Sequence, residues 1–332
     1  MSLRLHGDVV AGAGMLDFAV NVWPGERSDG LRAALLAALD DPRYPDDRAA
    51  RKAVAARHGR DGDEVLTLNG ACEGFWLLAH ALRPRVAACV HPSFTEPEAA
   101  LRACGAEIVR VARRSRDWAF DPAAVPERAE VVVVGNPNNP TGTLDPTASI
   151  LELLRPGRVV VVDESFMDFV PEPAPTLAGE PRDGLVVVRS LTKLWSLAGI
   201  RAGYLLAPPQ VVAALAAQRQ PWSVNALALA ALEACARDRA TPRRIGAEVA
   251  GARAELLEAL QALPGVHASP SAANFLLLEI PDGEAVVAAL HAAGIAVRPA
   301  ASFPGLSENH IRVAVRRPHE NRRLVDALAE AL

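Results

Sequence analysis

The segment Val159-Val-Val-Val-Asp163-Glu-Ser-Phe166 gives the clearest indication of the fold class. Four consecutive valines with no polar residue between them are typical of a strand that is covered on both faces, as in a parallel sheet. Similar short apolar runs recur along the chain and alternate with longer helical patterns. This alternation predicts an α/β fold in which helices sandwich a mostly parallel, mixed sheet.

The predicted elements follow this alternation up to about residue 225. The expected strands are 86–90, 108–111, 131–134, 159–162 and 185–188, and the expected helices are 72–82, 97–103 and 146–154. Beyond residue 225 the pattern changes to a long helix over 227–263, a strand over 273–279, a helix over 283–293, a strand over 311–315 and a closing helix over 320–332. We interpret the second pattern as a smaller α+β lobe.

The chain is therefore expected to have two lobes, since single hydrophobic cores stop growing at about 250 to 300 residues. The predicted division has an N-terminal segment, 1–28, that packs near the cleft with the small lobe. A large domain follows over 29–224, and a small C-terminal domain over 225–332.

The composition argues against nucleic-acid and membrane partners. The 332 residues carry a formal net charge of −4, and the chain has no basic run. It has no uninterrupted apolar stretch of 18 residues, and its start lacks the features of a signal peptide. The four cysteines have neither disulfide nor zinc-ligand spacing. We therefore expect reduced thiols, a cytoplasmic protein and no metal site.

Lysine is rare in this chain, and one lysine has an unusual setting. Of the 35 cationic residues, 33 are arginine and two are lysine. Lys52 lies in a polar helical stretch and fits a surface charge, whereas Lys193 follows an apolar strand and has hydroxyl residues beside it. Lysine can supply the neutral amine that a Schiff base needs, and arginine cannot. A surface charge is the commoner role of a single lysine, so the surrounding motifs decide between the two.

Polar residues follow three of the predicted strands, in the segments 135–142, 163–169 and 190–193. Ligands of an open α/β sheet bind at the carboxyl ends of its strands, so these loops are expected to converge. An amine, a carboxylate and an amide together fit pyridoxal 5'-phosphate, and Lys193, Asp163 and Asn139 are the respective candidates. Taken singly, Asp163 also fits a turn cap and Asn139 a structural turn.

Other residues are candidates to hold the phosphate and ring of this cofactor. Two hydroxyls and a bidentate cation for the phosphate come from Ser190, Thr192 and Arg201. The backbone N–H groups of Ala71 and Cys72 are expected at a helix N-terminus, which favours an anion. Phe94 is a candidate to stack on the ring; a core position for Phe94 and a surface position for Arg201 stay open.

In order and spacing, these motifs resemble the class I/II aminotransferases, the fold-type I pyridoxal-phosphate enzymes. They are Gly-Ala-x-Glu at 70–73, Pro-x-Phe at 92–94, Asn-Pro-Asn-Asn-Pro-Thr-Gly at 136–142, Asp-Glu-x-Phe at 163–166 and Ser-x-Thr-Lys at 190–193, with an arginine eight residues later. The resemblance covers nearly the whole chain and implies that family's fold, a large domain with a smaller α+β domain. It also implies that Lys193 carries the Schiff base, that Asp163 pairs with the ring nitrogen and that Asn139 meets the ring oxygen. Ser190, Thr192 and Arg201 would hold the phosphate.

The same resemblance implies contacts with a substrate and a partner subunit. Arg312 matches the arginine that grips a substrate carboxylate, with a salt-bridged strand residue as the alternative. Weaker candidates for a second anionic group are His6, Asn21, Arg298, Arg316 and Arg317. Tyr44 is expected to reach the cofactor phosphate of a second subunit, which implies a homodimer. Phe166 stands where many members have a tyrosine, so Asn139 and the Schiff-base nitrogen are the expected partners of the ring oxygen.

Two groups within the family are most similar, the threonine-phosphate decarboxylases of cobalamin synthesis and the histidinol-phosphate aminotransferases. The segments 6–8, 17–21 and 221–225 resemble the decarboxylases, so the expected function is a decarboxylase-like enzyme for a small phosphorylated amino acid. A histidinol-phosphate-type aminotransferase is the alternative, and a catalytically silent binding protein of the same fold is a distant one. Trp23 replaces an expected asparagine and Asp8 an expected glycine in the region that would contact substrate.

Overall fold

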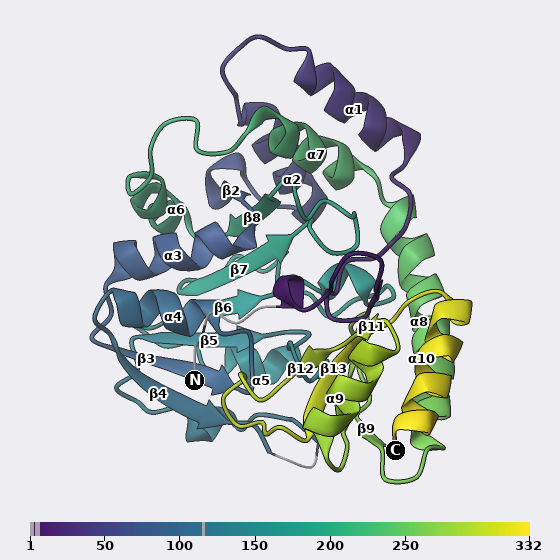
Figure 1. Ribbon diagram of the computed structural model, residues 1–332. Coiled ribbons are helices and arrows are strands. Elements are labelled where there is room, and N and C mark those ends of the chain that lie inside the picture. The colour runs from purple at the N-terminus through teal and green to yellow at the C-terminus, as the bar shows by residue number, and fades with distance from the viewer. Residues whose placement is uncertain (1–2, 4–6, 115–116) are drawn as a thin grey trace.

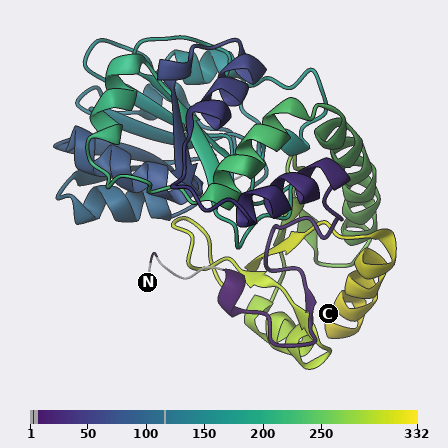
Figure 2. The same ribbon diagram turned by 90° about the horizontal axis from the view of Figure 1, so that it is seen from above.

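The computed structural model describes residue 3 and the ranges 7–114 and 117–332. The chain forms a large lobe around one sheet and a smaller lobe that contains the C-terminus (Figure 1). Seen from above, the yellow C-terminal elements lie together at one side, and the purple N-terminal segment runs along them (Figure 2).

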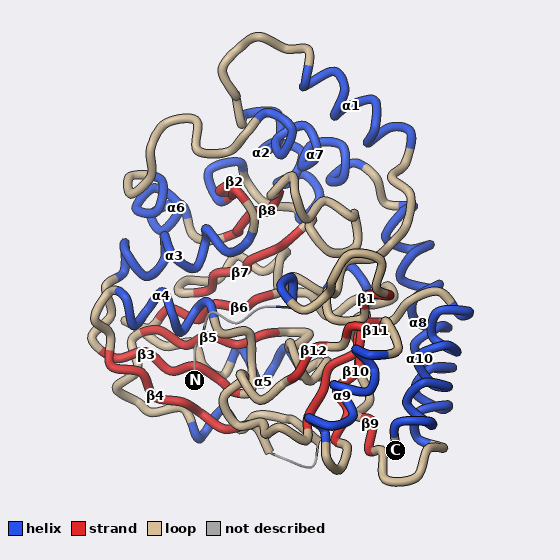
Figure 3. The backbone as a smooth tube through the Cα atoms, viewed as in Figure 1, coloured by secondary structure: helices blue, strands red, loops and turns tan. Residues whose placement is uncertain are grey.

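A seven-stranded sheet forms the centre of the large lobe, with the strand order β2-β8-β7-β6-β5-β3-β4. The tube in Figure 3 shows these strands in red, one beside the next. β8 runs antiparallel to both of its neighbours, and the other pairings are parallel. The strands are β2 (Val65–Asn69), β3 (Val86–His91), β4 (Glu107–Ala112), β5 (Val131–Gly135), β6 (Val159–Asp163), β7 (Leu185–Ser190) and β8 (Ala202–Leu206). The five predicted strands are confirmed as β3 to β7, and the mixed, mostly parallel sheet is confirmed with them.

The valine runs form buried strands because both faces of this sheet are covered. Alternate residues of β5 belong to two different apolar clusters, Val131 and Val133 to one and Val132 and Val134 to the other. One face is covered by α3 (Ala71–Leu82), α4 (Glu96–Ala103) and α6 (Pro209–Ala216), and α2 (Arg48–His58) and α7 (Ala226–Arg237) pack on the other. Short elements complete the lobe: η2 (Gly62–Glu64), η3 (Pro122–Ala124), α5 (Thr147–Leu151) and η4 (Met167–Phe169).

The small lobe is a four-stranded antiparallel sheet with helices beside it. Its strand order is β12-β13-β10-β9, with β9 (His267–Ala268), β10 (Phe275–Glu279), β12 (Arg298–Pro299) and β13 (His310–Ala314). Its helices are α8 (Ala240–Gln261), α9 (Gly283–Ala292) and α10 (Pro318–Ala331).

The single long helix predicted over 227–263 is wrong, because α7 and α8 are separate helices. Asp238 lies between them, and its carboxylate accepts from the N–H groups of Ala240 and Thr241 at 3.0 and 2.9 Å. A side chain that binds the first N–H groups of a helix starts a new helix there. α7 packs on α1 (Asp29–Leu39), α2 and β8 of the large lobe, whereas α8 packs on η4 and on elements of the small lobe.

The N-terminal segment joins the small lobe before it reaches α1. After η1 (Gly7–Val9), β1 (Leu16–Asp17) pairs in parallel with β11 (Ile295–Ala296). The N–H of Ala314 also donates to the carbonyl of Phe18 at 2.8 Å. These contacts support the predicted role of residues 1–28, and the division into three parts stays a proposal.

Candidate active site

Lys193 lies in the loop that follows β7, with its side chain half-buried. The N–H of Trp23 donates to the carbonyl of Lys193 at 3.0 Å, which ties this loop to the N-terminal segment. Burial, followed by the positive charges of Arg312 and Arg201, lowers the pKa of Lys193 from 10.5 to about 8. About a tenth of the amine is then neutral at pH 7, far more than for an exposed lysine, so a nucleophilic amine is available here.

Asp163 is the last residue of β6, between Gly135 of β5 and Val188 of β7. Its Oδ1 accepts from the N–H of Ser165 at 3.0 Å and from its hydroxyl at 2.5 Å. Burial raises the pKa of Asp163, while these hydrogen bonds and the charge of Lys193 act in the opposite direction. A buried carboxylate in this position gains from a cation placed beside it, as a protonated ring nitrogen would be.

The candidate phosphate site gathers residues from the ends of β7, β8 and β2. The Ser190 and Thr192 hydroxyl oxygens are 2.7 Å apart, and both side chains are buried. Arg201 lies against Gly70, because a Cβ built on Gly70 would stand 2.4 Å from Arg201 Nη2. Arg201 therefore lies at the start of α3, and its contact with a phosphate stays a prediction.

The start of α3 has backbone N–H groups that no side chain of the described residues caps, which favours an anion. Gly70 has a φ of +81° and occupies the N-cap position. A Cβ on Gly203 would stand 2.6 Å from the N atom of Ala71, so glycine allows β8 to approach the helix start closely. The N–H groups of Ala71 and Cys72 then add a helix N-terminus to the cation of Arg201. The sequence analysis gave neither glycine a role of its own, although Gly70 begins the Gly-Ala-x-Glu motif and lies two residues before the predicted helix.

Aromatic side chains line the neighbourhood of Lys193. Its Nζ lies 6.0 Å from the centroid of the Phe166 ring, and Phe166 packs edge-to-face on Phe275 with centroids 5.0 Å apart. Phe94 is half-buried and lies 6.4 Å from Phe75 between ring centroids. Phe166 thus forms part of an apolar wall beside the amine, while the stacking role of Phe94 stays a prediction.

Arg312 connects the small lobe, the large lobe and the N-terminal segment. It lies on β13, and its Nη1 donates to Asn139 Oδ1 while its Nη2 donates to the carbonyl of Ala19, both at 2.6 Å. Its buried Nε has no hydrogen-bond partner among the described residues. Burial and the charge of Arg298 lower the pKa of Arg312 to about 9, so the guanidinium is still charged at neutral pH. Because the Asn139 oxygen faces Arg312, the Asn139 amide nitrogen remains to donate elsewhere.

The weaker candidates for substrate contact differ in the hydrogen-bond partners of their side chains. Asn21 is buried, and neither polar atom of its side chain has a partner among the described residues. Arg316 donates to the carbonyls of Asp17, Val20 and Val22, so it fixes the N-terminal segment. His6 lies outside the described residues.

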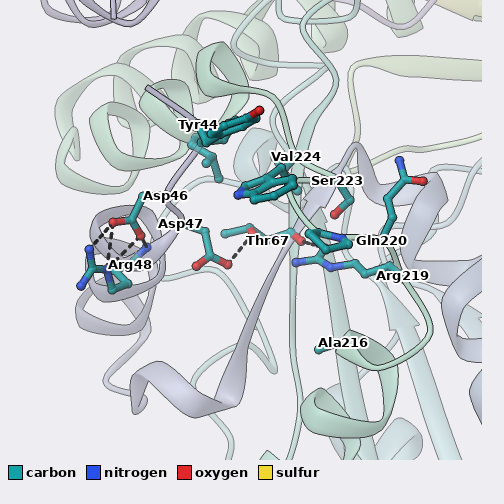
Figure 4. Close-up of a pocket in the computed structure, with 14 residues that line it drawn as sticks. Tyr44, Asp46, Asp47, Arg48, Thr67, Ala216, Arg219, Gln220, Ser223 and Val224 are labelled. Atoms are coloured by element: carbon teal, nitrogen blue, oxygen red, sulfur yellow. Dashed lines mark hydrogen bonds and ion pairs between the residues drawn. The ribbon is translucent and has the colours of Figure 1, made fainter. Parts of the chain in front are cut away.

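Tyr44 lies at the surface, 76% exposed, and stacks on Trp222 with ring centroids 4.5 Å apart. It borders a cavity of about 640 Å³ that includes Thr67 and Arg219 (Figure 4). Arg219 Nη1 donates to the carbonyl of Thr67 at 2.6 Å, two residues before Asn69 at the end of β2. The predicted contact of Tyr44 with a second subunit stays a prediction.

Neither a metal site nor a membrane span is seen where the structure is described. No three His, Cys, Asp or Glu residues in that part of the chain are grouped to hold a metal ion. No helix in the described ranges is both long and apolar enough to cross a bilayer.

Comparisons with known proteins identify the family. The family model for aminotransferases of class I and II matches residues 13–328. The chain belongs to this family. It is 45% identical to a histidinol-phosphate aminotransferase of Mycobacterium bovis, over 94% of this chain and 87% of that protein. It is 33% identical to a threonine-phosphate decarboxylase of Salmonella typhimurium, over 96% of this chain and 91% of that protein.

A solved structure with the same fold supports this assignment. Histidinol-phosphate aminotransferase from Sinorhizobium meliloti, in complex with pyridoxal 5'-phosphate, superposes with a TM-score of 0.86 at 21% identity. The match covers 96% of this chain and 90% of that one. The chain has the fold-type I architecture predicted from its motifs, and it is a pyridoxal-phosphate-dependent enzyme of the aminotransferase family.

The described residues fit this cofactor. The uncapped start of α3 beside Arg201 fits a phosphate, and the buried carboxylate of Asp163 fits a ring cation. Lys193, with its lowered pKa, fits the aldehyde. The role of each single residue stays a proposal.

Proposed function

We propose that this chain is an aminotransferase of the histidinol-phosphate type, which acts on a small phosphorylated amine with an amino acid or its keto acid as the second substrate. The observation that carries the proposal is the 45% identity to a histidinol-phosphate aminotransferase over 94% of the chain. The sequence motifs alone favoured the decarboxylase, whose named relative is 33% identical. The comparisons thus support the alternative interpretation of the sequence more strongly than the first one.

The first half of the proposal concerns how the chain holds its cofactor. Ser190, Thr192, Arg201 and the N–H groups of Ala71 and Cys72 bind the phosphate. Asp163 keeps the ring nitrogen protonated, and the Asn139 amide donates to the ring oxygen, a direction that its contact with Arg312 supports. When bound, pyridoxal phosphate supplies an electron sink for a bond broken at the substrate α-carbon.

Lys193 has two roles in this proposal. Its amine holds the cofactor until a substrate amine replaces it, and the released amine then moves a proton at the α-carbon. The lowered pKa supports the second role, because a general base works best when its pKa lies near the working pH. Phe166 and Phe275 keep water from the face of the site that they border.

Arg312 and its neighbours recognise the anionic part of the substrate. The Nε of Arg312 is buried without a partner among the described residues, and its Nη atoms are held in place by Asn139 and Ala19. A fixed, planar guanidinium binds carboxylate or phosphate in a bidentate manner. Asn21 offers further polar atoms without partners, and His6 and Arg298 remain candidates for a second anionic group.

We further propose a homodimer in which Tyr44 reaches the cofactor phosphate of the other subunit. Large apolar side chains are exposed at Leu36, Leu39, Tyr44 and Trp222, on elements that lie near one another around α1 and the cavity beside Tyr44. Exposed apolar groups of this kind are typical of protein interfaces. Sedimentation of the purified protein tests this point.

Decarboxylation of threonine phosphate is the second candidate. The decarboxylase relative covers 96% of the chain, and the opening segment 17–21 resembles that group. Purified protein loaded with cofactor would be mixed with histidinol phosphate plus 2-oxoglutarate, and separately with threonine phosphate. Glutamate formation in the first mixture supports the aminotransferase, and carbon dioxide release in the second supports the decarboxylase. The absence of both products contradicts both candidates.

A further inference from the structure

A network of buried charges lies directly behind the candidate active site. We call it the Arg189 network, and it consists of Glu164, Asp168, Thr176, Arg189 and Trp195. Arg189 and the two carboxylates are nearly buried, with side chains exposed by 7%, 0% and 10%. Arg189 is on β7 next to Ser190, and adjacent residues of a strand point to opposite faces. The network therefore occupies the opposite side of β7 from the candidate phosphate site.

The guanidinium, the two carboxylates, the hydroxyl and the indole N–H of the network all form hydrogen bonds. Arg189 Nη1 donates to Glu164 Oε2 at 2.9 Å, and Nη2 donates to the Asp168 carboxylate. Trp195 Nε1 donates to the other oxygen of Asp168 at 3.3 Å. Glu164 also accepts from the Thr176 hydroxyl at 2.5 Å and from the N–H of Leu177 at 2.7 Å. A buried network in which the charged groups are all paired is rigid.

The network alternates along the chain with the candidate cofactor residues. Glu164 directly follows Asp163, Arg189 directly precedes Ser190, and Trp195 is two residues beyond Lys193. The backbones of β6 and β7 are joined by the sheet, but Lys193 lies in the loop beyond the last ladder pair. Trp195 and Asp168 connect this loop to the segment that follows Asp163.

We propose that the Arg189 network positions Lys193 relative to Asp163, with Trp195 and Asp168 as positioning residues that do not touch the cofactor. The proposal rests on the cofactor roles given to Lys193 and Asp163 under the proposed function. Stability alone is a weak reason for such a network, because well-packed apolar residues often replace a buried ion pair without loss. The exact position of Lys193 is a stronger reason for the network, since a shift of about 1 Å in a reacting group costs about a hundredfold in rate.

Two variants test the proposal: Asp168→Asn keeps the side-chain shape and removes the charge, and Trp195→Phe keeps an aromatic ring and removes the N–H that donates to Asp168. The control is Glu64→Gln, which alters a similar pair: Arg60 and Glu64 are 2.7 Å apart, with side chains exposed by 3% and 14%. Glu64 directly precedes β2, at the end of that strand remote from Gly70.

The first measurement uses the cofactor-free protein and does not depend on activity. The chain has only two lysines, so protein labelled with carbon-13 at the lysine ε position gives one signal from Lys193 and one from exposed Lys52. We expect both network variants to raise the pKa of Lys193 from about 8 toward 10.5, as its amine moves toward water. Glu64→Gln is expected to leave that pKa unchanged.

The second measurement uses the loaded enzyme. We expect kcat to fall about tenfold or more in both network variants, with little change in KM, because placement and not substrate affinity is lost. An unchanged Lys193 pKa and an unchanged kcat in Trp195→Phe and Asp168→Asn would overturn the positioning role. Equal changes in Glu64→Gln would also overturn it, since they would report general loosening. A wild-type protein that forms no bond between Lys193 and the cofactor would instead overturn the proposed function.

Discussion

Replacing Lys193 with methionine is expected to stabilise the cofactor-free protein at neutral pH. The pKa of Lys193 is lowered from 10.5 to about 8 by burial and by the charges of Arg312 and Arg201. One pKa unit corresponds to about 1.4 kcal/mol, so holding the ammonium in this site costs the fold up to about 3 kcal/mol at pH 7. The side chain is only half-buried, and water screens part of this cost. The expected gain is therefore about 1–3 kcal/mol.

The gain should disappear at high pH. The unfolded chain keeps the lysine proton up to about pH 10.5, whereas the folded chain releases it from about pH 8 upward. Between these values the unfolded state binds more protons, so the free energy of unfolding of the wild type rises with pH relative to the variant. Above about pH 10.5 the amine is neutral in both states and the cost is gone.

Urea unfolding of both cofactor-free proteins at pH 7, 8, 9 and 10 measures this difference. Lys52→Met is the matched control, because Lys52 is exposed on α2 and its replacement should give no comparable gain. No gain in stability from Lys193→Met at pH 7, or an equal gain at pH 7 and pH 10, would show that Lys193 is not held in this site as a costly ammonium.

Three further changes test other parts of the site. Gly70→Ala places a Cβ 2.4 Å from Arg201 Nη2 at a residue with a φ of +81°. The cofactor dissociation constant, measured by equilibrium titration, should therefore rise at least about tenfold. Unchanged affinity would show that Gly70 is not part of the phosphate site. Asp163→Asn should keep cofactor binding but lower kcat by about a hundredfold or more, and a wild-type kcat would contradict the role of the carboxylate. Arg312→Lys loses the planar contacts to Asn139 and Ala19, so KM for the amino-acid substrate should rise about tenfold or more. A KM within twofold of wild type would argue against Arg312 as the anion-binding residue.

The buried strands and the residues at their ends were predictable because their signal is local. Four valines followed by a carboxylate indicate a strand and its carboxyl end, and β6 with Asp163 is where the sequence placed them. β2 and β8 were not recognised as strands, since Leu66-Thr-Leu and Ala202-Gly-Tyr lack a continuous β-branched run. The break between α7 and α8 was also missed, although Asp238 and Pro242 beside it are residue types typical of helix starts.

The contacts that join distant segments were not predictable from spacing. Asn139 and Arg312 are 173 residues apart, and the oxygen that Arg312 binds decides which way the Asn139 amide points. Glu164, Arg189 and Trp195 have no motif of their own, so the network that they share becomes visible only when β6 and β7 lie side by side. The exposure of Tyr44 and its stacking on Trp222 likewise depend on packing between remote loops.

The proposed function depends most directly on a covalent bond between the Lys193 amine and pyridoxal phosphate. Borohydride reduction of the loaded protein fixes such a bond, and mass spectrometry of its peptides locates it. The added mass is expected on the peptide that contains Lys193, and it should be lost in Lys193→Met. An adduct on Lys52 alone, or none on either lysine, would contradict the role of Lys193 as the cofactor-binding residue.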